Sequence, residues 1–301
     1  MKQFVAAVLI CLLTLHMIVV PTQAASSNQC IEPQFSIVLK TNAELKSKAS
    51  HTSKTVKTYP KNKKLSVMKR NGDWYSICYS KKIVYLAIED AREVFNAKER
   101  AVLVQTDAKP DVKQVVSAVG PILQSTKVTI QAFEKRKGEW RRALTEMKGI
   151  VGKKGFTTNK KEGDGKSPIG MYSFGTAFGS GAKPSGMKLT YKKTTKYDYW
   201  VDDVTSKDYN KWITYKGVPT KKWKSFERMN HSLYRYGVVI NYNVNPIVKG
   251  KGSAIFLHIW RGENGVTAGC VATSEKNVLR LLNWLNPSKH PHIIMDTIET
   301  L

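Results

Sequence analysis

The chain has 301 residues and a formal net charge of +26, from 49 Lys and Arg against 23 Asp and Glu. Such a basic surface attracts polyanions. Nucleic acid is excluded as the main partner, because no helix-turn-helix pattern or stacking platform is present and the first residues predict export. After those residues no apolar run approaches membrane length, which excludes a stable membrane insertion of the mature chain.

Residues 1–25 have the pattern of a secretory signal peptide. Lys2 precedes a short apolar run at residues 4–20, and small residues at Thr22 and Ala24 occupy the minus-three and minus-one positions for cleavage after Ala24. This pattern predicts a secreted protein of the cell wall or extracytoplasmic space. An uncleaved membrane anchor is the alternative.

Residues 26–95 are predicted to form a small β-barrel module. Short β-type runs at residues 64–68, 74–79 and 83–86 surround an Asn71-Gly72 hairpin turn. The module resembles the bacterial SH3-like modules attached to wall enzymes, most clearly at residues 72–77. Between residues 40 and 70 there are ten basic residues and one acidic residue. This charge favours an electrostatic anchor for anionic wall polymers such as teichoic acids, and a spacer without a binding role is the alternative.

The cysteines indicate the same compartment. Cys11 leaves with the signal peptide, so Cys30, Cys78 and Cys270 remain, and three thiols allow one internal bridge. The economical pairing is Cys30 with Cys78, because both lie in the N-terminal module. That pairing leaves Cys270 free, although a bridge from Cys270 to either partner stays open.

The third segment, residues 96–301, is predicted to be the catalytic domain. A charged helix at residues 89–100 marks the boundary, and valines at helical spacing predict a second helix before Gly120-Pro121. Strands are expected at residues 127–135 and around Trp140. Near the end, Ser274 is expected to cap a helix, and residues 293–295 are expected to form a last strand. The valines are Val112, Val115, Val116 and Val119, and the apolar stripe of the last helix is Val278, Leu281, Leu282 and Leu285.

Half of the 20 glycines lie between residues 149 and 186, so this segment must turn often. The run Gly165-Lys166-Ser167 is not a phosphate loop, because Lys160 stands where that motif requires glycine. The aromatic, lysine-rich residues 191–223 lack a regular period and predict a long loop or subdomain beside the active site.

A short stretch brings one His and one Cys together. Residues 254–259 predict a buried strand with His258 near its end, and Gly262 and Gly265 predict the turn that returns the chain to Cys270. A thiol with a pKa near 8.5 needs a base within hydrogen-bond reach to act as a nucleophile. The stretch therefore predicts a catalytic Cys-His pair, and a buried structural Cys and His are the alternative.

At these residues the sequence resembles the L,D-transpeptidase catalytic domain family, whose pattern is a His, a loop, and then Ser/Thr-His-Gly-Cys. His258 and Thr267-Ala268-Gly269-Cys270 match it, and the resemblance extends over residues 101–295. Two further stretches agree with the family, residues 163–175 and residues 199–203. Ala268 replaces the usual second His and Ala272 replaces the usual Arg or Asn, so the contacts of those side chains are missing.

The resemblance implies a mainly β chain, in which the SH3-like β-barrel is followed by a β-sandwich-type catalytic domain with a few helices. It implies an exported peptidoglycan L,D-transpeptidase in which Cys270 attacks the third stem residue, expels the terminal D-alanine and holds a thioester. An amine of another stem then takes the acyl group. The implied roles are a base for His258, orientation of the imidazole by Ile259, oxyanion binding at Gly269, and substrate binding at Arg261 and Thr267.

Three alternatives stay open at this point. An L,D-carboxypeptidase would use water as the acceptor, and a non-catalytic protein would bind the wall through its basic module. A zinc site from His258, Cys270 and His290 or His292 matches no compact ligand motif. No metal or cofactor is therefore expected, and the expected partners are peptidoglycan stem peptides.

Overall fold

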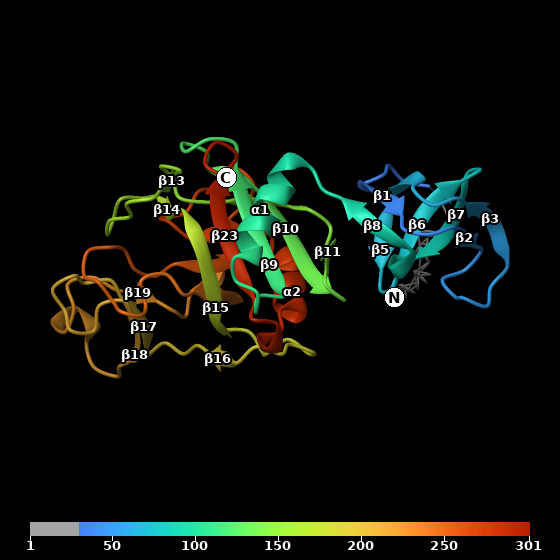
Figure 1. The fold of residues 1–301 in the computed structure, drawn as a ribbon. Coiled ribbons are helices and arrows are strands. Elements are labelled where there is room, and N and C mark those ends of the chain that lie inside the picture. The colour runs from blue at the N-terminus through green and yellow to red at the C-terminus, as the bar shows by residue number, and fades with distance from the viewer. Residues whose placement is uncertain (1–29) are drawn as a thin grey trace, which may run out of the picture.

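A computed structural model describes residues 30–301, and within them the protein is mainly β, with two α-helices. The predicted signal peptide lies outside the described residues. Figure 1 shows two lobes, an N-terminal β-lobe and a larger C-terminal lobe that carries both helices and is called the catalytic lobe after its predicted role. Of the helices in the described part, none is long and apolar enough to cross a membrane.

The N-terminal lobe contains eight strands in two sheets, of order β4-β1-β8 and β3-β2-β7-β6-β5. The predicted hairpin around Asn71-Gly72 joins β5 to β6, and Tyr75 and Leu86 are fully buried in the core of the lobe. These strands confirm the β prediction, and the SH3-like identity of the lobe stays a prediction. The bounds are β1 (Phe35–Leu39), β2 (Ala43–Lys46), β3 (Thr55–Tyr59), β4 (Lys64–Val67), β5 (Lys69–Asn71), β6 (Trp74–Tyr79), β7 (Lys82–Ala87) and β8 (Ala91–Val94).

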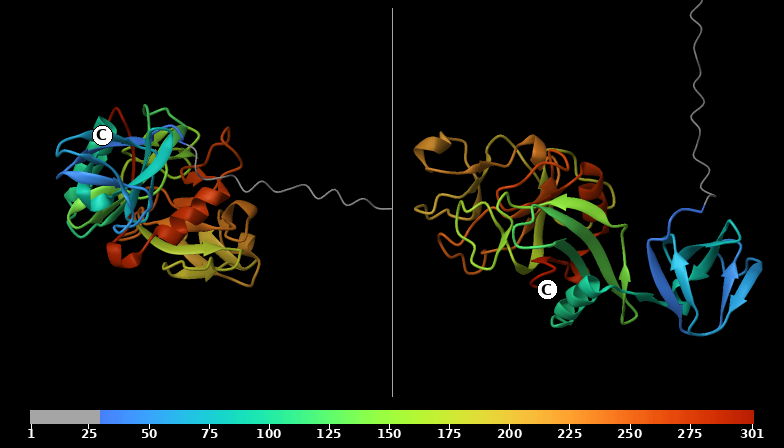
Figure 2. Two further views of the ribbon diagram at one scale, coloured as in Figure 1. Left: turned by 90° about the vertical axis from the view of Figure 1, so that its right-hand side faces the viewer. Right: turned by 90° about the horizontal axis from the view of Figure 1, so that it is seen from above.

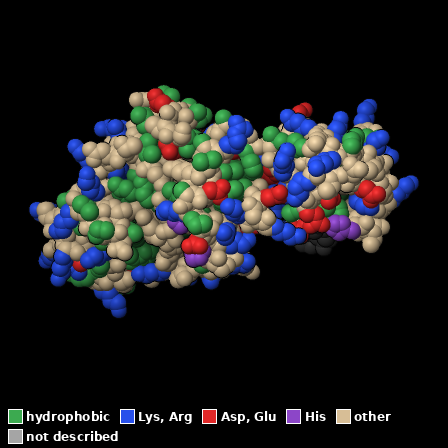
Figure 3. All heavy atoms as spheres, viewed as in Figure 1, with side chains coloured by type: hydrophobic (Ala, Val, Ile, Leu, Met, Phe, Trp, Pro, Cys, Tyr) green, Lys and Arg blue, Asp and Glu red, His purple; other side chains and the backbone are tan. Residues whose placement is uncertain are grey.

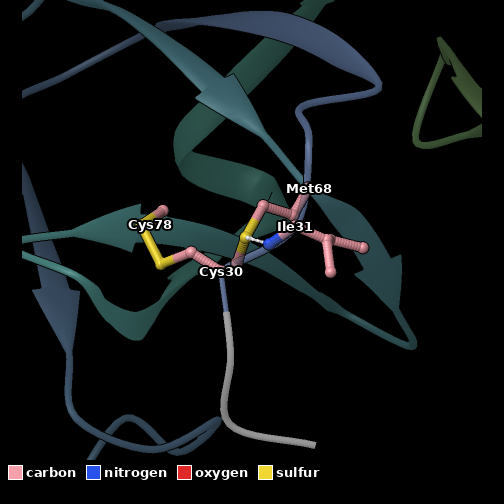
Figure 4. The surroundings of a disulfide bond; sticks show 4 residues. All are labelled: Cys30, Ile31, Met68 and Cys78. Carbon is pink, nitrogen blue, oxygen red and sulfur yellow. Dashed lines mark hydrogen bonds between the residues drawn. A yellow bond between two sulfur atoms is a disulfide. The ribbon is translucent and has the colours of Figure 1, made fainter.

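The predicted disulfide between Cys30 and Cys78 is present, and it ties the start of the described chain to β6 (Figure 4). Beside it the backbone N–H of Ile31 donates to the sulfur of Met68. A bridge over this loop stabilises the lobe by about 4 kcal/mol in the chain-entropy model. Cys270 is free and buried, which leaves its thiol available for chemistry.

The catalytic lobe is built on one ten-stranded sheet of order β11-β10-β12-β22-β21-β20-β15-β23-β9, with β16 paired to β15. The sheet closes on itself because β10 also pairs with β9, so it is a single closed sheet and not two separate stacked ones. The bounds are β9 (Gln114–Gly120), β10 (Lys127–Arg136), β11 (Glu139–Arg142), β12 (Met147–Ile150), β15 (Gly170–Gly179), β16 (Tyr191–Lys193), β20 (Gly237–Ile240), β21 (Phe256–Ile259), β22 (Val271–Thr273) and β23 (His292–Thr297).

Two helix predictions are corrected by the structure. The valine segment is strand β9, which is buried on both faces, because Val115 and Val119 face α1 (Ala97–Asp107) while Val116 and Ala118 face the main core. A strand buried on both faces has no alternation to show its period. The predicted helix at residues 89–100 is a short 3-10 turn, strand β8 and only the start of α1.

The last elements follow the prediction. Ser274 caps α2 (Glu275–Trp284) by accepting from the N–H of Asn277, and the predicted apolar stripe packs into the main core. The predicted strand at residues 293–295 is the middle of β23. The helix was predictable from its single apolar stripe, and the strand, which is buried on both faces, was predictable from its run of apolar residues.

Residues 191–236 contribute a capping segment that lies at the end of the catalytic lobe farthest from the N-terminal lobe (Figures 1 and 2). Its small sheet contains β17 (Asp198–Val201), β18 (Lys211–Thr214) and β19 (Glu227–Arg228), and a 3-10 turn, η3 (Ser232–Tyr234), follows. A second 3-10 turn of the cap is η2 (Pro219–Lys221). Outside the cap, the described residues form two more 3-10 turns, η1 (Ile88–Asp90) and η4 (Pro287–Lys289). Two short strands, β13 (Phe156–Thr157) and β14 (Ser167–Pro168), pair in the glycine-rich segment.

The two lobes are joined by a polar clasp from β11. Arg141 donates to the Tyr75 hydroxyl oxygen and to the carbonyl of Ala91, each at 2.6 Å. Arg142 donates from its guanidinium to Glu93 at 3.1 Å, and its guanidinium lies 4.7 Å from the rings of both Phe35 and Phe95. A cavity of about 490 Å³ lies at this junction, lined by residues of both lobes. The lobes therefore share buried polar contacts.

Candidate active site

His258 and Cys270 lie on one face of two adjacent strands. β21 and β22 are parallel, with His258 in register with Ala272. Side chains alternate along a strand, so Cys270 shares the face of Ala272, and Phe256 shares the face of His258. The packing agrees, because Phe256 and Cys270 belong to an aromatic cluster while Leu257 and Val271 face the main core. The fold thus brings the predicted pair together.

The thiol of Cys270 bonds to backbone groups at the start of β21. It accepts from the N–H of Phe256 at 3.3 Å and donates to the carbonyl of Ala254 at 3.2 Å. Among residues 30–301 no hydrogen bond joins this thiol to His258, so the expected thiol-imidazole bond is not formed in this state. A sulfur that already receives an N–H is prepared to carry negative charge.

Burial keeps both members of the pair uncharged. Cys270 is 5% exposed and His258 6% exposed. Desolvation, together with the nearby charge of Glu227, raises the pKa of the Cys270 thiol. Burial lowers the pKa of His258 to about 4, against the opposing effect of the Ile259 carbonyl. At neutral pH the site therefore holds a thiol and a neutral imidazole.

The predicted orienting contact at Ile259 is present. The carbonyl of Ile259 lies 2.8 Å from Nδ1 of His258. A carbonyl can only accept, so Nδ1 carries the proton and Nε2 is left with its lone pair. The imidazole is therefore held in the tautomer that can take a proton at Nε2.

The residues before Cys270 form a tight turn held by two hydroxyl groups. The N–H of Gly269 donates to the Thr267 hydroxyl at 3.1 Å, and that hydroxyl donates to the carbonyl of Cys270 at 2.7 Å. Ser167 donates to the carbonyl of Gly269 at 2.7 Å and accepts from the N–H of Gly152 at 3.0 Å. Thr267 thus shapes the turn. Sequence reasoning missed the role of Ser167, although this residue lies in the stretch 163–175 that agrees with the family.

Gly269 is required at its position by its backbone conformation and by a close neighbour. Its φ is +153°, and a Cβ placed on it would lie 2.8 Å from the carbonyl oxygen of Lys166. The protein's own backbone therefore leaves no room for a side chain here. Its N–H, predicted to bind an oxyanion, donates to Thr267 in this state.

Sequence reasoning did not select Ala254, which accepts the thiol's hydrogen bond, or Asn210, which holds Ala254 in place. Ala254 has a φ of +53°, a region that residues with a Cβ rarely occupy, and its carbonyl receives the thiol. Asn210 of the cap accepts from the N–H of Ala254 at 3.2 Å and from the indole of Trp200 at 2.8 Å. The cap is therefore fastened beside the nucleophile. No sequence signal marks this contact, because Asn210 lies in the segment without a period.

Tyr234 covers the imidazole from the cap side. Its ring lies 5.1 Å from that of His258 in an edge-on arrangement and 5.6 Å from that of Phe256. Its hydroxyl donates to the carboxylate of Glu227. Burial and the charge of Glu227 raise the pKa of Tyr234, so its hydroxyl keeps its proton. Sequence reasoning did not select either residue.

The remaining predicted residues lie apart from the pair. Arg261 is exposed on the loop after β21, and so is Ala268, while Ala272 is fully buried beside His258. Within residues 30–301 no three His, Cys, Asp or Glu side chains group as a metal site, so the residues of the zinc alternative are not brought together. His290 and His292 line a different cavity, near Ser173.

Comparisons with known proteins agree with the predicted resemblance. The family model described as YkuD, the L,D-transpeptidase catalytic domain, matches residues 125–294, which is more than half of the chain and includes both His258 and Cys270. No curated protein matches. A solved structure, the helical cell shape determining protein Pgp2 from Campylobacter jejuni, is similar at 16% identity and a TM-score of 0.33, over 62% of this chain and 48% of that chain.

Proposed function

This chain belongs to the L,D-transpeptidase catalytic domain family, and on that premise we propose that it is an exported cysteine acyl-transferase acting on peptidoglycan stem peptides. The observation that carries the proposal is the pair of His258 and Cys270, buried on one face of adjacent strands inside the matched region. The donor is a tetrapeptide stem, and the acceptor is an amine of a neighbouring stem.

The first half-reaction forms the thioester. Nε2 of His258 takes the thiol proton, and the sulfur of Cys270 attacks the carbonyl carbon of the third stem residue. Before this step the sulfur is held by the N–H of Phe256 and the carbonyl of Ala254. The C–N bond to the terminal D-alanine then breaks, and His258 returns the proton to the leaving amine.

The thiol has to leave the Ala254 carbonyl before it can meet the imidazole. We propose that rotation about the Cα–Cβ bond of Cys270 brings the thiol to the imidazole, since both side chains share one face of the sheet. We assign the oxyanion contact to the N–H groups of Cys270 and Gly269, each worth about 3 kcal/mol in comparable sites. The second of these becomes free when the Thr267 hydroxyl turns away.

The second half-reaction decides between two activities of one thioester. Attack by an amine gives a transpeptidase, and attack by water gives an L,D-carboxypeptidase. We favour transfer, because the buried site holds the thioester away from bulk water and a bound amine competes well there. Arg261, exposed on the loop after β21, is proposed to meet a substrate carboxylate.

Intact-mass spectrometry after exposure to a tetrapeptide stem or a carbapenem tests the assignment. Wild type should gain the acyl mass, while Cys270→Ala should gain none and Cys270→Ser should keep the fold but lose nearly all rate. His258→Ala should slow acylation by roughly a hundredfold or more. His290→Ala, an exposed histidine of the other cavity, is the matched control and should react as wild type. An adduct on Cys270→Ala would refute the catalytic reading.

We also propose that residues 26–95 hold the protein to anionic wall polymers in the extracytoplasmic space. Lys and Arg side chains are spread over both lobes on the face shown in Figure 3, and the N-terminal lobe has ten basic residues between positions 40 and 70. Exposed charges are screened within about 8 Å at physiological salt. Sedimentation with purified walls should therefore weaken as salt rises, and binding that ignores both salt and removal of teichoic acid would contradict an electrostatic anchor.

A further inference from the structure

We propose that Glu227 is the residue that receives the acceptor amine: it binds the incoming ammonium and removes its first proton, while Tyr234 holds it beside His258. The proposal rests on the proposed function, because it assigns the second substrate of that same site. It adds a catalytic residue that lies outside the Cys-His stretch and comes from the cap.

Glu227 is joined to the reacting pair through Tyr234 and is more exposed than the pair. It begins β19 and is in register with Trp200 of β17, so the small cap sheet fixes its backbone. Its carboxylate receives the hydroxyl of Tyr234, whose ring packs on His258 and Phe256. Glu227 and Tyr234 are half-buried, whereas His258 and Cys270 are almost fully covered. An incoming amine would therefore meet the carboxylate before it reaches the sulfur.

The surroundings of Glu227 suit a cation. Glu227 raises the pKa of the Cys270 thiol, so its charge acts across the site. Its own pKa is raised to about 7, by desolvation and by the charges of Asp202 and Glu162, against the Tyr234 hydrogen bond. One oxygen of Asp202 is buried and receives no hydrogen bond from any residue in the described part.

Lys160, whose charge acts on the Cys270 thiol, is paired with Asp164 and not with Glu227. Within residues 30–301, no Lys or Arg forms an ion pair with Glu227, Asp202 or Glu162, in a chain whose net charge is +26. Arg228, the neighbour of Glu227, lies over the rings of Tyr199 and Phe226 instead. The titratable groups around Glu227 and the thiol are Tyr234 from η3, Cys270 before β22, Asp202 after β17, and Glu162 and Lys160 from the glycine-rich segment, and His258 of β21 lies against the Tyr234 ring.

The chemistry balances with these groups alone. The acceptor arrives as an ammonium and gives one proton to the Glu227 carboxylate. The neutral nitrogen then attacks the thioester carbon, a C–N bond forms, and its second proton passes to Nε2 of His258. The C–S bond breaks, and His258 returns that proton to the sulfur of Cys270. Glu227 releases its proton to water, so thioester and ammonium become amide, thiol and one free proton.

The test separates acylation from transfer. The experiment compares wild type, Glu227→Gln and the control Glu146→Gln. Glu146 is an exposed glutamate between β11 and β12. Each protein is acylated in two separate reactions, one with a carbapenem and one with a tetrapeptide stem. All three should form the thioester at rates within a few-fold of one another. With a second stem as the amine, Glu227→Gln should form at least tenfold less amide at neutral pH and lose the rise in transfer rate near pH 7. The control should behave as wild type.

The second comparison uses an acceptor that is uncharged at neutral pH. Hydroxylamine is uncharged at neutral pH, so it needs no carboxylate to remove a proton, and Glu227→Gln should react with it within a few-fold of wild type. Tyr234→Phe, which keeps the ring on His258 and removes the hydroxyl, should lie between wild type and Glu227→Gln with the stem amine. Equal loss with hydroxylamine, or unchanged amide yield with the stem, would overturn the role of Glu227. Absence of any thioester in wild type would instead refute the proposed function.

Discussion

Ser167→Ala tests whether the turn before the nucleophile is held from the glycine-rich segment. The Ser167 hydroxyl is fully buried and joins the carbonyl of Gly269 to the N–H of Gly152. Its removal leaves two buried backbone groups without a partner, each at a cost of about 1 to 3 kcal/mol. We expect a loss of about 2 to 6 kcal/mol, or a fall in Tm of about 4 to 24 °C for a domain of this size. Acylation of Cys270 should slow as well, because the turn that carries it loosens.

Ser173→Ala is the matched control for this measurement. Its hydroxyl makes one hydrogen bond, from the Asn241 side-chain amide at 2.9 Å, and the residue is only half-buried. It should cost about 1 kcal/mol or less and leave acylation unchanged. Chemical unfolding and carbapenem acylation are measured on both variants. If Ser167→Ala matched Ser173→Ala in both assays, the claim that Ser167 positions the turn would be wrong.

Two further changes follow from buried charge. Arg142→Ala removes the ion pair to the fully buried Glu93 carboxylate and should cost about 3 to 5 kcal/mol, measured by urea unfolding, and a loss below 1 kcal/mol would contradict the clasp. Because the pKa of His258 is lowered to about 4 by burial, the unfolded chain binds its proton first and stability is lost as pH falls from about 7 toward 4. Wild type should therefore lose about 2 kcal/mol more than His258→Gln between pH 7 and pH 5, and parallel pH curves would show that His258 is not buried neutral.

Much of the fold could be predicted where one face of an element is apolar and the other polar. The strands around Asn71-Gly72 and the capped helix α2 have this pattern, whereas the strand that carries His258 is buried on both faces and was predictable from its continuous apolar run. The cysteine count predicted the Cys30–Cys78 bridge. Strand β9 was predicted to be a helix, because the spacing of its valines fits both periods when a segment is buried on both sides.

The reacting pair was predictable, but its surroundings were not. The loop between His258 and Cys270 is short, so local sequence predicts that the two meet. The groups that hold them come from elsewhere in the chain: Ser167 lies 102 residues from Gly269, and Asn210 lies 44 residues from Ala254. Such contacts follow from sheet topology, which a single sequence does not encode in any local pattern. Glu227 belongs to the same class, because only the fold of the cap brings it to the site.

The polar clasp at the junction has a consequence for how far the enzyme can act. Two domains on a flexible tether sample many separations, and the reach of one from the other grows with the length of the linker. Here Arg141 and Arg142 of the catalytic lobe bond to groups of the N-terminal lobe, so the lobes keep one spacing and one angle. The small sheet of the cap, β17 to β19, lies at the end of the molecule away from the N-terminal lobe (Figure 1). If the N-terminal lobe binds the wall, the rigid connection fixes the distance between the attachment point and Cys270. The enzyme then reaches only those stem peptides that lie at this distance from the attachment point.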